Sequence, residues 1–276
     1  MSATQRTNSG ISAQFLQNPT GLVDGILSGV IQAGAGAMQV NSSSLVVMRN
    51  GLQETVPNTT LNVTAADATN PRVDMVQWNG TTLSMKNGTA ASVTTINAPS
   101  PDSGNIPLAL IYIYPNGTTI KDLGQQDSSG QFNAIFAYYY ARRGLYACLA
   151  ARQSSSGPFG STADPIVALP VYNARAGVYR FDYASNLTVA DGSTQCRLQV
   201  IVGLDGTQFT GSGTGANTTV AQLDTAASTS QGSCNAHVTY SRGIISSGVH
   251  RWNPFISGSG TSQTLTYRQA ELQEIL

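Results

Sequence analysis

The segment from residue 70 to residue 122 constrains the fold most, because Asn-Gly pairs there, among them Asn79-Gly80 and Asn116-Gly117, interrupt runs of apolar residues. Within VDMVQWNGTTLSM, residues 73–85, the pair Asn79-Gly80 predicts a two-residue turn between antiparallel strands. A type I′ turn needs positive φ at both central residues, which Gly adopts freely and Asn better than most residues. The turn would place Trp78 opposite Thr81, Val76 opposite Leu83 and Asp74 opposite Met85. This segment therefore predicts β-structure.

The first part of the chain contains further strand candidates, separated by connections rich in Asn, Gly, Pro and Ser. A second turn of the same kind is expected at Asn116-Gly117, after LALIYIY. Residues 21–38 are apolar but contain Asp24 and five glycines, so we expect strand and loop, or a short helix, instead of a membrane span. The spacing of the candidates is typical of an antiparallel sandwich or open barrel. The expected strands cover residues 39–40, 45–48, 60–63, 73–78, 82–85, 93–96 and 108–114.

Alternation of apolar and polar residues characterises the last part of the chain. Tyr179, Phe181 and Tyr183 share one face of a predicted strand, while Arg180 and Asp182 share the other. This alternation predicts a two-sheet β-sandwich. The same pattern covers residues 167–171, 196–204, 238–240 and 265–267.

A change of composition divides the chain at LGQQDSSGQ, residues 123–131, which predicts a linker. The 276 residues suffice for two domains, each with its own core. After the linker, residues 132–140 and 145–153 indicate a hairpin, with a helix as the alternative, and the terminus at 269–276 is a strand or a short helix. We therefore expect an arm at 1–20, a β domain at 21–122 and a β-sandwich domain at 132–276. The arm either orders against a neighbouring subunit or frays.

Charged residues are scarce. They make up 10% of the chain, against about 25% in a typical domain, and 14 basic residues balance 14 acidic ones. A nucleic-acid-binding role is excluded by this balance, since such proteins neutralise phosphates with Lys and Arg. The first 15 residues contain one Arg and no apolar core, so they predict no secretory signal.

The residues that carry catalysis or bind metals are also few. Cys148, Cys196 and Cys234 lack metal-ligand spacing and are expected as buried free thiols, with a Cys196–Cys234 disulfide as the alternative. The histidines are His237 and His250, and no pair of carboxylates stands out for glycosidase chemistry. We expect no enzyme, no cofactor and no metal.

Aromatic residues after the linker are the candidates for ligand contact. Their rings stack on the apolar faces of sugars, while neighbouring polar groups bind the hydroxyls. Packing in a core or at a trimer axis is the alternative for the same residues. The candidate glycan or receptor contacts are Trp252, His250, Tyr267 and Tyr139.

Two segments resemble modules of virion proteins. The run Asn70-Pro71-Arg72-Val73-Asp74 follows AADAT and precedes Gly88-Thr89-Ala90-Ala91, Ala98-Pro99 and IPLALIYI at 106–113. This order resembles a module of minor tail, baseplate and fibre proteins of tailed bacteriophages. The strands at 165–276 resemble the jelly roll of tumour necrosis factor and C1q heads, which recurs as trimers at the ends of phage fibres.

The resemblance implies a trimeric, non-enzymatic fibre, spike or baseplate component of a tailed phage. The β domain at 21–122 would attach to other virion proteins, and the jelly roll would bind a host glycan or receptor. A capsid decoration or head-fibre protein is the alternative within the same class. The alternatives from other classes are a polysaccharide-degrading tail enzyme and a secreted or pilus-like adhesin. No nucleic acid and no membrane insertion is expected.

Overall fold

The computed structural model describes most of the chain. In the described part the residues form strands and turns and no helix, which confirms the all-β prediction. No described segment forms an apolar helix of the length that a membrane span requires. The predicted arm at 1–20 lies outside the description. The described residues are 22–93, 95–123, 125, 133–142, 144–151, 155–157, 162–163, 169–189, 196–205, 222–227, 232–259 and 263–275.

The N-terminal strands form two layers that face each other. They are β1 (Gly25–Ala33), β2 (Gln39–Arg49), β3 (Leu52–Val56), β4 (Thr60–Asn62), β5 (Arg72–Trp78), β6 (Leu83–Lys86), β7 (Ile106–Ile113) and β8 (Ala134–Tyr140). In one layer β2 pairs with β1, β3 and β4, and in the other β5 pairs with β6 and β7. The layers meet at β8, which pairs with β7 and contacts β1 through the pair Ile26–Tyr140. The predicted sandwich or open barrel is confirmed.

The C-terminal strands form two layers that cover each other. They are β9 (Gly144–Ala151), β10 (Ser155–Gly157), β11 (Thr162–Ala163), β12 (Leu169–Asn173), β13 (Gly177–Val189), β14 (Cys196–Leu204), β15 (Gln222–Ala227), β16 (Gly232–Ile245), β17 (Gly248–Ser259) and β18 (Gln263–Glu274). The two strand orders are β9-β18-β13-β16 and β12-β17-β14-β15. Except for the β14–β15 hairpin, each described strand from β12 onward is followed by one in the other sheet. This connectivity is that of a jelly roll.

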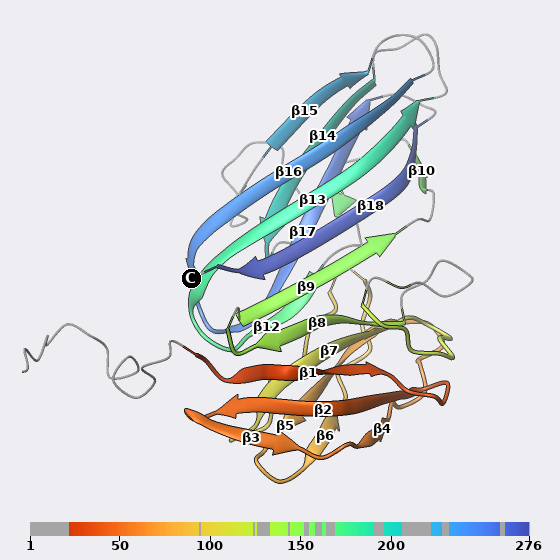
Figure 1. Cartoon of the computed structure of the whole chain (residues 1–276). Helices are drawn as coiled ribbons and strands as arrows, with labels where there is room; N and C mark the ends of the chain where they lie inside the picture. Colours follow the sequence, from red (N-terminus) through yellow and green to blue (C-terminus); the bar gives the residue numbers. More distant parts are fainter. Residues whose placement is uncertain are drawn as a thin grey trace, which may run out of the picture.

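A central layer of β5, β7 and β8 separates two apolar cores. Every residue of β5 and β7 is buried, as expected for strands covered on both faces. Leu108 and Ile111 of β7 face the core between the N-terminal layers, whereas Leu110 faces the core shared with the jelly roll. Figure 1 shows the N-terminal strands below and the jelly roll above, with β8 and β9 between them.

The sheet runs across the predicted domain boundary. The linker expected at 123–131 lies largely outside the described residues, and the chain returns from it to pair β8 with β7. From β8 the sheet continues through β9 to β18, so that the described strands on both sides form one 13-stranded sheet. The predicted hairpin of 132–140 and 145–153 is confirmed as β8–β9, with Tyr140 paired to Gly144.

The predicted register of the hairpin at Asn79 is wrong. Trp78 pairs with Leu83 instead of Thr81, and Val76 pairs with Met85 instead of Leu83, while Asp74 lies beyond the paired residues of the two strands. The reason is that Asn79 Oδ1 accepts hydrogen bonds from the backbone amides of Thr81 and Thr82, at 2.9 and 2.8 Å. Its side chain thus closes a four-residue loop, residues 79–82, and Asn79 itself does not adopt the positive φ of a type I′ turn.

Other local predictions also need correction. Asn116 has positive φ but makes no hairpin, since its amide and side chain donate to the carbonyls of Asp67 and Ala68. Of the strand expected at 93–96, residues 93 and 95 lie in a turn, in which Thr95 and Ile96 donate to the carbonyl of Ser92. The two strands expected at 39–40 and 45–48 are the single strand β2. The terminus to Glu274 is a strand, β18, and the helical alternative does not occur there.

Because both cores contact β7, we expect the described body to unfold as one unit. Leu108→Ala and Leu110→Ala, on opposite faces of β7, should each reduce the free energy of unfolding by about 2–5 kcal/mol through cavity formation. Calorimetry should show that both variants shift the same transition. Leu52→Ala is the control, since Leu52 is 67% exposed and should change stability by no more than about 0.5 kcal/mol. Two transitions, each shifted by only one of the variants, would contradict the prediction that the two cores unfold as one unit.

Candidate functional site

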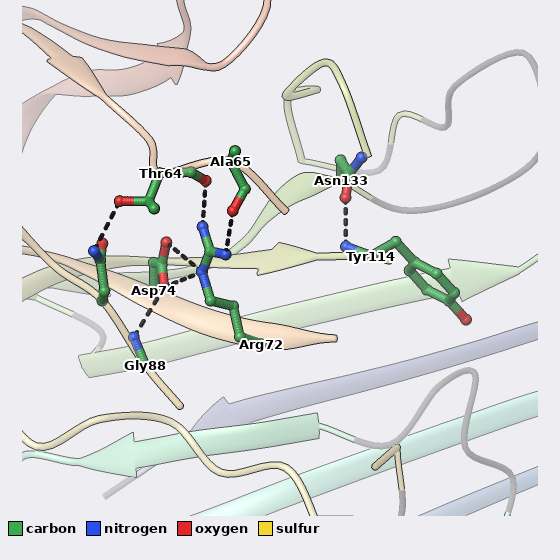
Figure 2. A network of polar contacts seen from close by, with 8 residues as sticks. Thr64, Ala65, Arg72, Asp74, Gly88, Tyr114 and Asn133 are labelled. Carbon is green, nitrogen blue, oxygen red and sulfur yellow. Dashed lines mark hydrogen bonds and ion pairs between the residues drawn. The ribbon is translucent and has the colours of Figure 1, made fainter. Parts of the chain in front are cut away.

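The Asn-Pro-Arg-Val-Asp run forms a buried ion pair at the start of β5. Arg72 and Asp74 share a face of the strand because side chains two residues apart point the same way. Arg72 Nε donates to both carboxylate oxygens of Asp74, at 3.0 and 3.2 Å. Its Nη1 donates to the carbonyl of Ala65 at 2.6 Å, and its Nη2 to the carbonyl of Thr64 (Figure 2). The guanidinium therefore joins β5 to the segment before it.

The Gly-Thr-Ala-Ala element belongs to the same network. Gly88 N donates to Asp74 Oδ1 at 2.9 Å, and a Cβ at Gly88 would overlap the carbonyl oxygen of Val73, so that only glycine fits (Figure 2). Ala91 N donates to the carbonyl of Pro71 at 3.0 Å. Burial raises the pKa of the Asp74 carboxyl, and the hydrogen bonds from Arg72 and Gly88 offset part of that rise. These motif residues are structural, since they hold three chain segments together around the buried Arg72–Asp74 pair.

A second buried polar group lies at the end of β7. Asn133 Oδ1 accepts a hydrogen bond from Tyr114 N (Figure 2), and its backbone carbonyl accepts one from Lys121 N at 2.6 Å. Gly117 passes so close that a Cβ there would overlap the Asn133 amide. The glycine of the Asn116-Gly117 pair is therefore required by close packing, not by a hairpin turn.

Two of the predicted glycan contacts lie in the core shared with the jelly roll. Trp252 is fully buried and stacks on Phe181, with ring centroids 5.6 Å apart and planes 6° apart. Tyr139 is 3% exposed, and its hydroxyl donates to the carbonyl of Tyr172 at 2.7 Å. Neither ring presents a face to a ligand. Both rings pack in a core, which is one of the alternatives to ligand contact given above. Tyr267 belongs to β18, but its side chain lies outside the described set.

His250 is held on both sides of its ring at the start of β17. Nδ1 lies 2.7 Å from Asp205 Oδ2, and Nε2 lies 3.0 Å from the carbonyl oxygen of Ser246 and 3.5 Å from its hydroxyl. A Ser-His-Asp set needs the serine hydroxyl to donate to Nε2, whereas here Nε2 lies nearer to the carbonyl oxygen of Ser246 than to its hydroxyl. We therefore interpret this set as a clasp between the ends of β14 and β16.

The clasp alters the ionisation of Asp205. Burial alone would raise the pKa of this carboxyl, but hydrogen bonds from His250 and from Arg251 N at 2.7 Å bring the pKa below its ordinary value. The other histidine, His237, points outward from β16 as expected. Of the cysteines, Cys148 is a buried free thiol, and the side chains of Cys196 and Cys234 lie outside the described residues.

A groove of about 490 Å³ lies on the outer face of the jelly-roll sheet. It spans three neighbouring strands, β16, β13 and β18, whose outward side chains are polar. Strand pairing places Asp182 directly between Thr239 and Glu271, and Ala184 directly between His237 and Gln269. The polar side chains that line it are Arg180, Asp182, His237, Thr239, Gln269 and Glu271.

This groove was not found from the sequence, because the residues come from strands far apart in the chain. Asp182 and Glu271 face each other only through the antiparallel pairing of β13 with β18. Arg180 Nε donates to Asp182 Oδ2 at 3.0 Å, and Gln269 Nε2 donates to a carboxylate oxygen of Glu271. The available signal was the outward face of the alternating strand, on which Arg180 and Asp182 were correctly placed.

Comparisons with known proteins show only distant structural likeness. No protein-family model and no curated protein sequence matches the chain. Eiger TNF from S. frugiperda shares 9% identity over 48% of this chain and 93% of that chain, with a TM-score of 0.32. A structure of infectious bursal disease virus, Gx strain, shares 11% identity over 90% and 67%, with a TM-score of 0.29. The Cry4Aa toxin of Bacillus thuringiensis shares 11% identity over 92% and 53%, with a TM-score of 0.26. These values are low, so the fold assignment rests on strand connectivity.

The buried ion pair predicts a large loss of stability when one partner is removed. Asp74→Leu and Arg72→Met should each reduce the free energy of unfolding by about 3–5 kcal/mol, because each leaves the charge of the other partner buried without its counter-charge. The double variant Arg72→Met/Asp74→Leu should lose less than the sum of the two single changes, since no charge stays buried. Urea denaturation of the four proteins measures this coupling, and strictly additive losses would contradict it.

The clasp predicts a pH-dependent contribution from Asp205. Because its folded-state pKa is lowered, the carboxylate stabilises the fold above its unfolded pKa of about 3.9 and loses that effect as the pH falls through the folded value. Asp205→Asn should cost up to about 1 kcal/mol at neutral pH, because nearly half of the side chain is exposed. Urea denaturation should show this difference shrinking below about pH 4.

Ser246→Ala is the control for the clasp. It removes the hydroxyl but keeps the carbonyl nearest to His250, so the pH dependence of stability should match that of the wild type. A profile for Asp205→Asn that stays parallel to the wild type through the acid range would show that the carboxylate is not stabilised by His250.

Proposed function

We propose that this chain is a structural, non-enzymatic virion protein, a fibre, spike or baseplate component of a tailed phage. One observation carries the proposal. The residues behind the sequence resemblance, Arg72, Asp74 and Gly88, form a single buried network. These residues are needed to hold the fold of the module together. Sharing them with phage virion proteins therefore supports a shared module more strongly than a similar overall composition would.

The arrangement of the two halves supports an attachment and display role. The N-terminal sandwich would bind other virion proteins, and the jelly roll would project from it as a knob. Because β8 and β9 join the halves in one hydrogen-bonded sheet, the knob has a fixed orientation relative to its base (Figure 1). A rigid connection of this kind suits a particle surface, where a receptor contact must be held at a defined position.

The composition supports adhesion through many weak contacts. A chain with 10% charged residues presents mainly amide and hydroxyl groups, which bind polar, uncharged surfaces. Single contacts of this type are weak, and several copies on one particle raise the avidity by orders of magnitude. We therefore propose a homotrimer that binds a host glycan or receptor. A capsid decoration or head-fibre role is the alternative, and it uses the same two modules.

The proposal predicts a trimer on the virion surface that binds host cells. Light scattering of the purified chain should give three times the 28.8 kDa of one chain, and labelled protein should bind host cells in a saturable way. Antibodies against the jelly roll should label tails or baseplates in electron micrographs; labelling of heads would favour the decoration role. A monomeric mass together with unlabelled particles would refute the proposal.

A glycosidase remains the second candidate, and one observation favours it. Asp182 and Glu271 are two carboxylates in one groove, the residue types that glycoside hydrolysis uses. Incubation of the chain with host polysaccharide separates the two functions. Release of oligosaccharides that stops in Glu271→Gln would identify an enzyme, whereas binding without release supports the structural role.

A further inference from the structure

We propose that the groove on β13, β16 and β18 binds the hydroxyl groups of a neutral saccharide. The inference rests on the proposed adhesive function and names its contact surface. The aromatic residues expected to make this contact, Trp252 and Tyr139, are packed in the core. The groove instead offers exposed polar groups, fixed by strand register, on the outer face of the jelly roll.

The shape of the groove comes from a small residue between larger ones. Ala184 pairs with His237 on one side and Gln269 on the other. Because its side chain is much shorter than theirs, the sheet surface is hollowed at Ala184. Because the flanking groups are on paired strands, their backbones are held by the ladder. A ligand entering this hollow therefore meets polar groups that need little reorganisation, which lowers the entropic cost of binding.

The acceptors of the groove are its two carboxylates. Asp182 and Glu271 lie directly opposite each other, an arrangement that is unfavourable for like charges in a sheet. Each receives one described side-chain donor, from Arg180 and Gln269 respectively. An ionised carboxylate accepts about four hydrogen bonds, so both retain acceptor capacity on the groove side. Donors placed between them would relieve the repulsion.

Saccharide hydroxyls fit this requirement better than anionic ligands do. Hydroxyl groups donate short, charge-assisted hydrogen bonds to carboxylates and also accept from donors such as Thr239. Arg180 balances one of the two carboxylates, so the Arg, Asp and Glu side chains of the groove carry a net negative charge. Phosphate, sulfate and carboxylate groups are disfavoured by that charge. The ligand class is therefore a neutral, polyhydroxylated sugar.

An aromatic residue borders the groove on the β9 side. Tyr146 lies on the outer face with Cys148, and the two are paired with Gln273 and Glu271 of β18. Its ring is partly exposed. Aromatic rings beside polar groups suit the apolar faces of sugars, so Tyr146 extends the same contact surface.

Glycan-array screening of the full-length protein, followed by calorimetric titration with a bound neutral oligosaccharide, tests the proposal. Glu271→Gln removes one charged acceptor and should weaken binding about tenfold or more. Ala184→Leu fills the hollow and should abolish binding without touching the polar groups. Ser241→Leu is the matched control, because Ser241 is exposed on the same face of β16 but does not line the groove. It should bind as the wild type does.

The outcomes separate this inference from the proposed function. If the protein binds saccharides and both groove variants bind equally well, the groove is not the contact, although the adhesive role stands. If the wild type binds only acidic saccharides, the assigned ligand class is wrong. If it binds none while labelled protein still binds host cells, the inference fails and the adhesive function stands; if it binds neither, both fail. If Ala184→Leu changes the oligomeric mass in light scattering, the groove is an interface between copies and the inference is overturned.

Discussion

The burial of β7 on both faces is the constraint on which the rest of the structure depends. Leu108 and Ile111 complete the N-terminal core, and Leu110 and Tyr112 complete the core shared with the jelly roll. Burying each such side chain contributes about 1.5–3 kcal/mol, so neither core is complete without this strand. The two halves therefore share one layer, and separating them would expose a strand that has no polar face.

Polar clasps at the ends of strands fix how the shared layer joins its neighbours. Glu274, at the end of β18, accepts hydrogen bonds from Leu145 N at 3.1 Å and Arg175 Nε at 2.6 Å. Gly144 lies against this carboxylate with φ of 68°, where a Cβ would both strain the backbone and overlap Glu274. Burial raises the pKa of Glu274, and its partners offset part of the rise. The last strand is thus locked onto the β8–β9 turn.

The parts of the fold that follow from local periodicity were predictable. The alternation of Tyr179, Phe181 and Tyr183 placed all three in the core, and each is fully buried. The hairpin register was not predictable, because the side chain of Asn79 competes with the backbone for the turn amides. The burial of β7 on both faces was not predictable either, for a different reason. A short apolar run shows that a strand is buried but not which two surfaces cover it.

The candidate site was less accessible to sequence reasoning than the fold, since it is made by pairing between distant strands. Trp252 was predicted as a glycan contact because sugars stack on aromatic rings. In the jelly roll its ring instead fills space in the core between the sheets. The surface left for recognition is then the outer polar face, where register and not composition decides which groups meet. The pairing of Asp182 with Glu271 places two like charges side by side, at a cost to the β13–β18 ladder. A ligand that donates to both carboxylates removes that cost in the bound state, and binding therefore stabilises the strand pairing that creates the groove. Because β18 also pairs with β9, which joins the central layer through β8, that stabilisation acts on the connection between the jelly roll and the N-terminal sandwich.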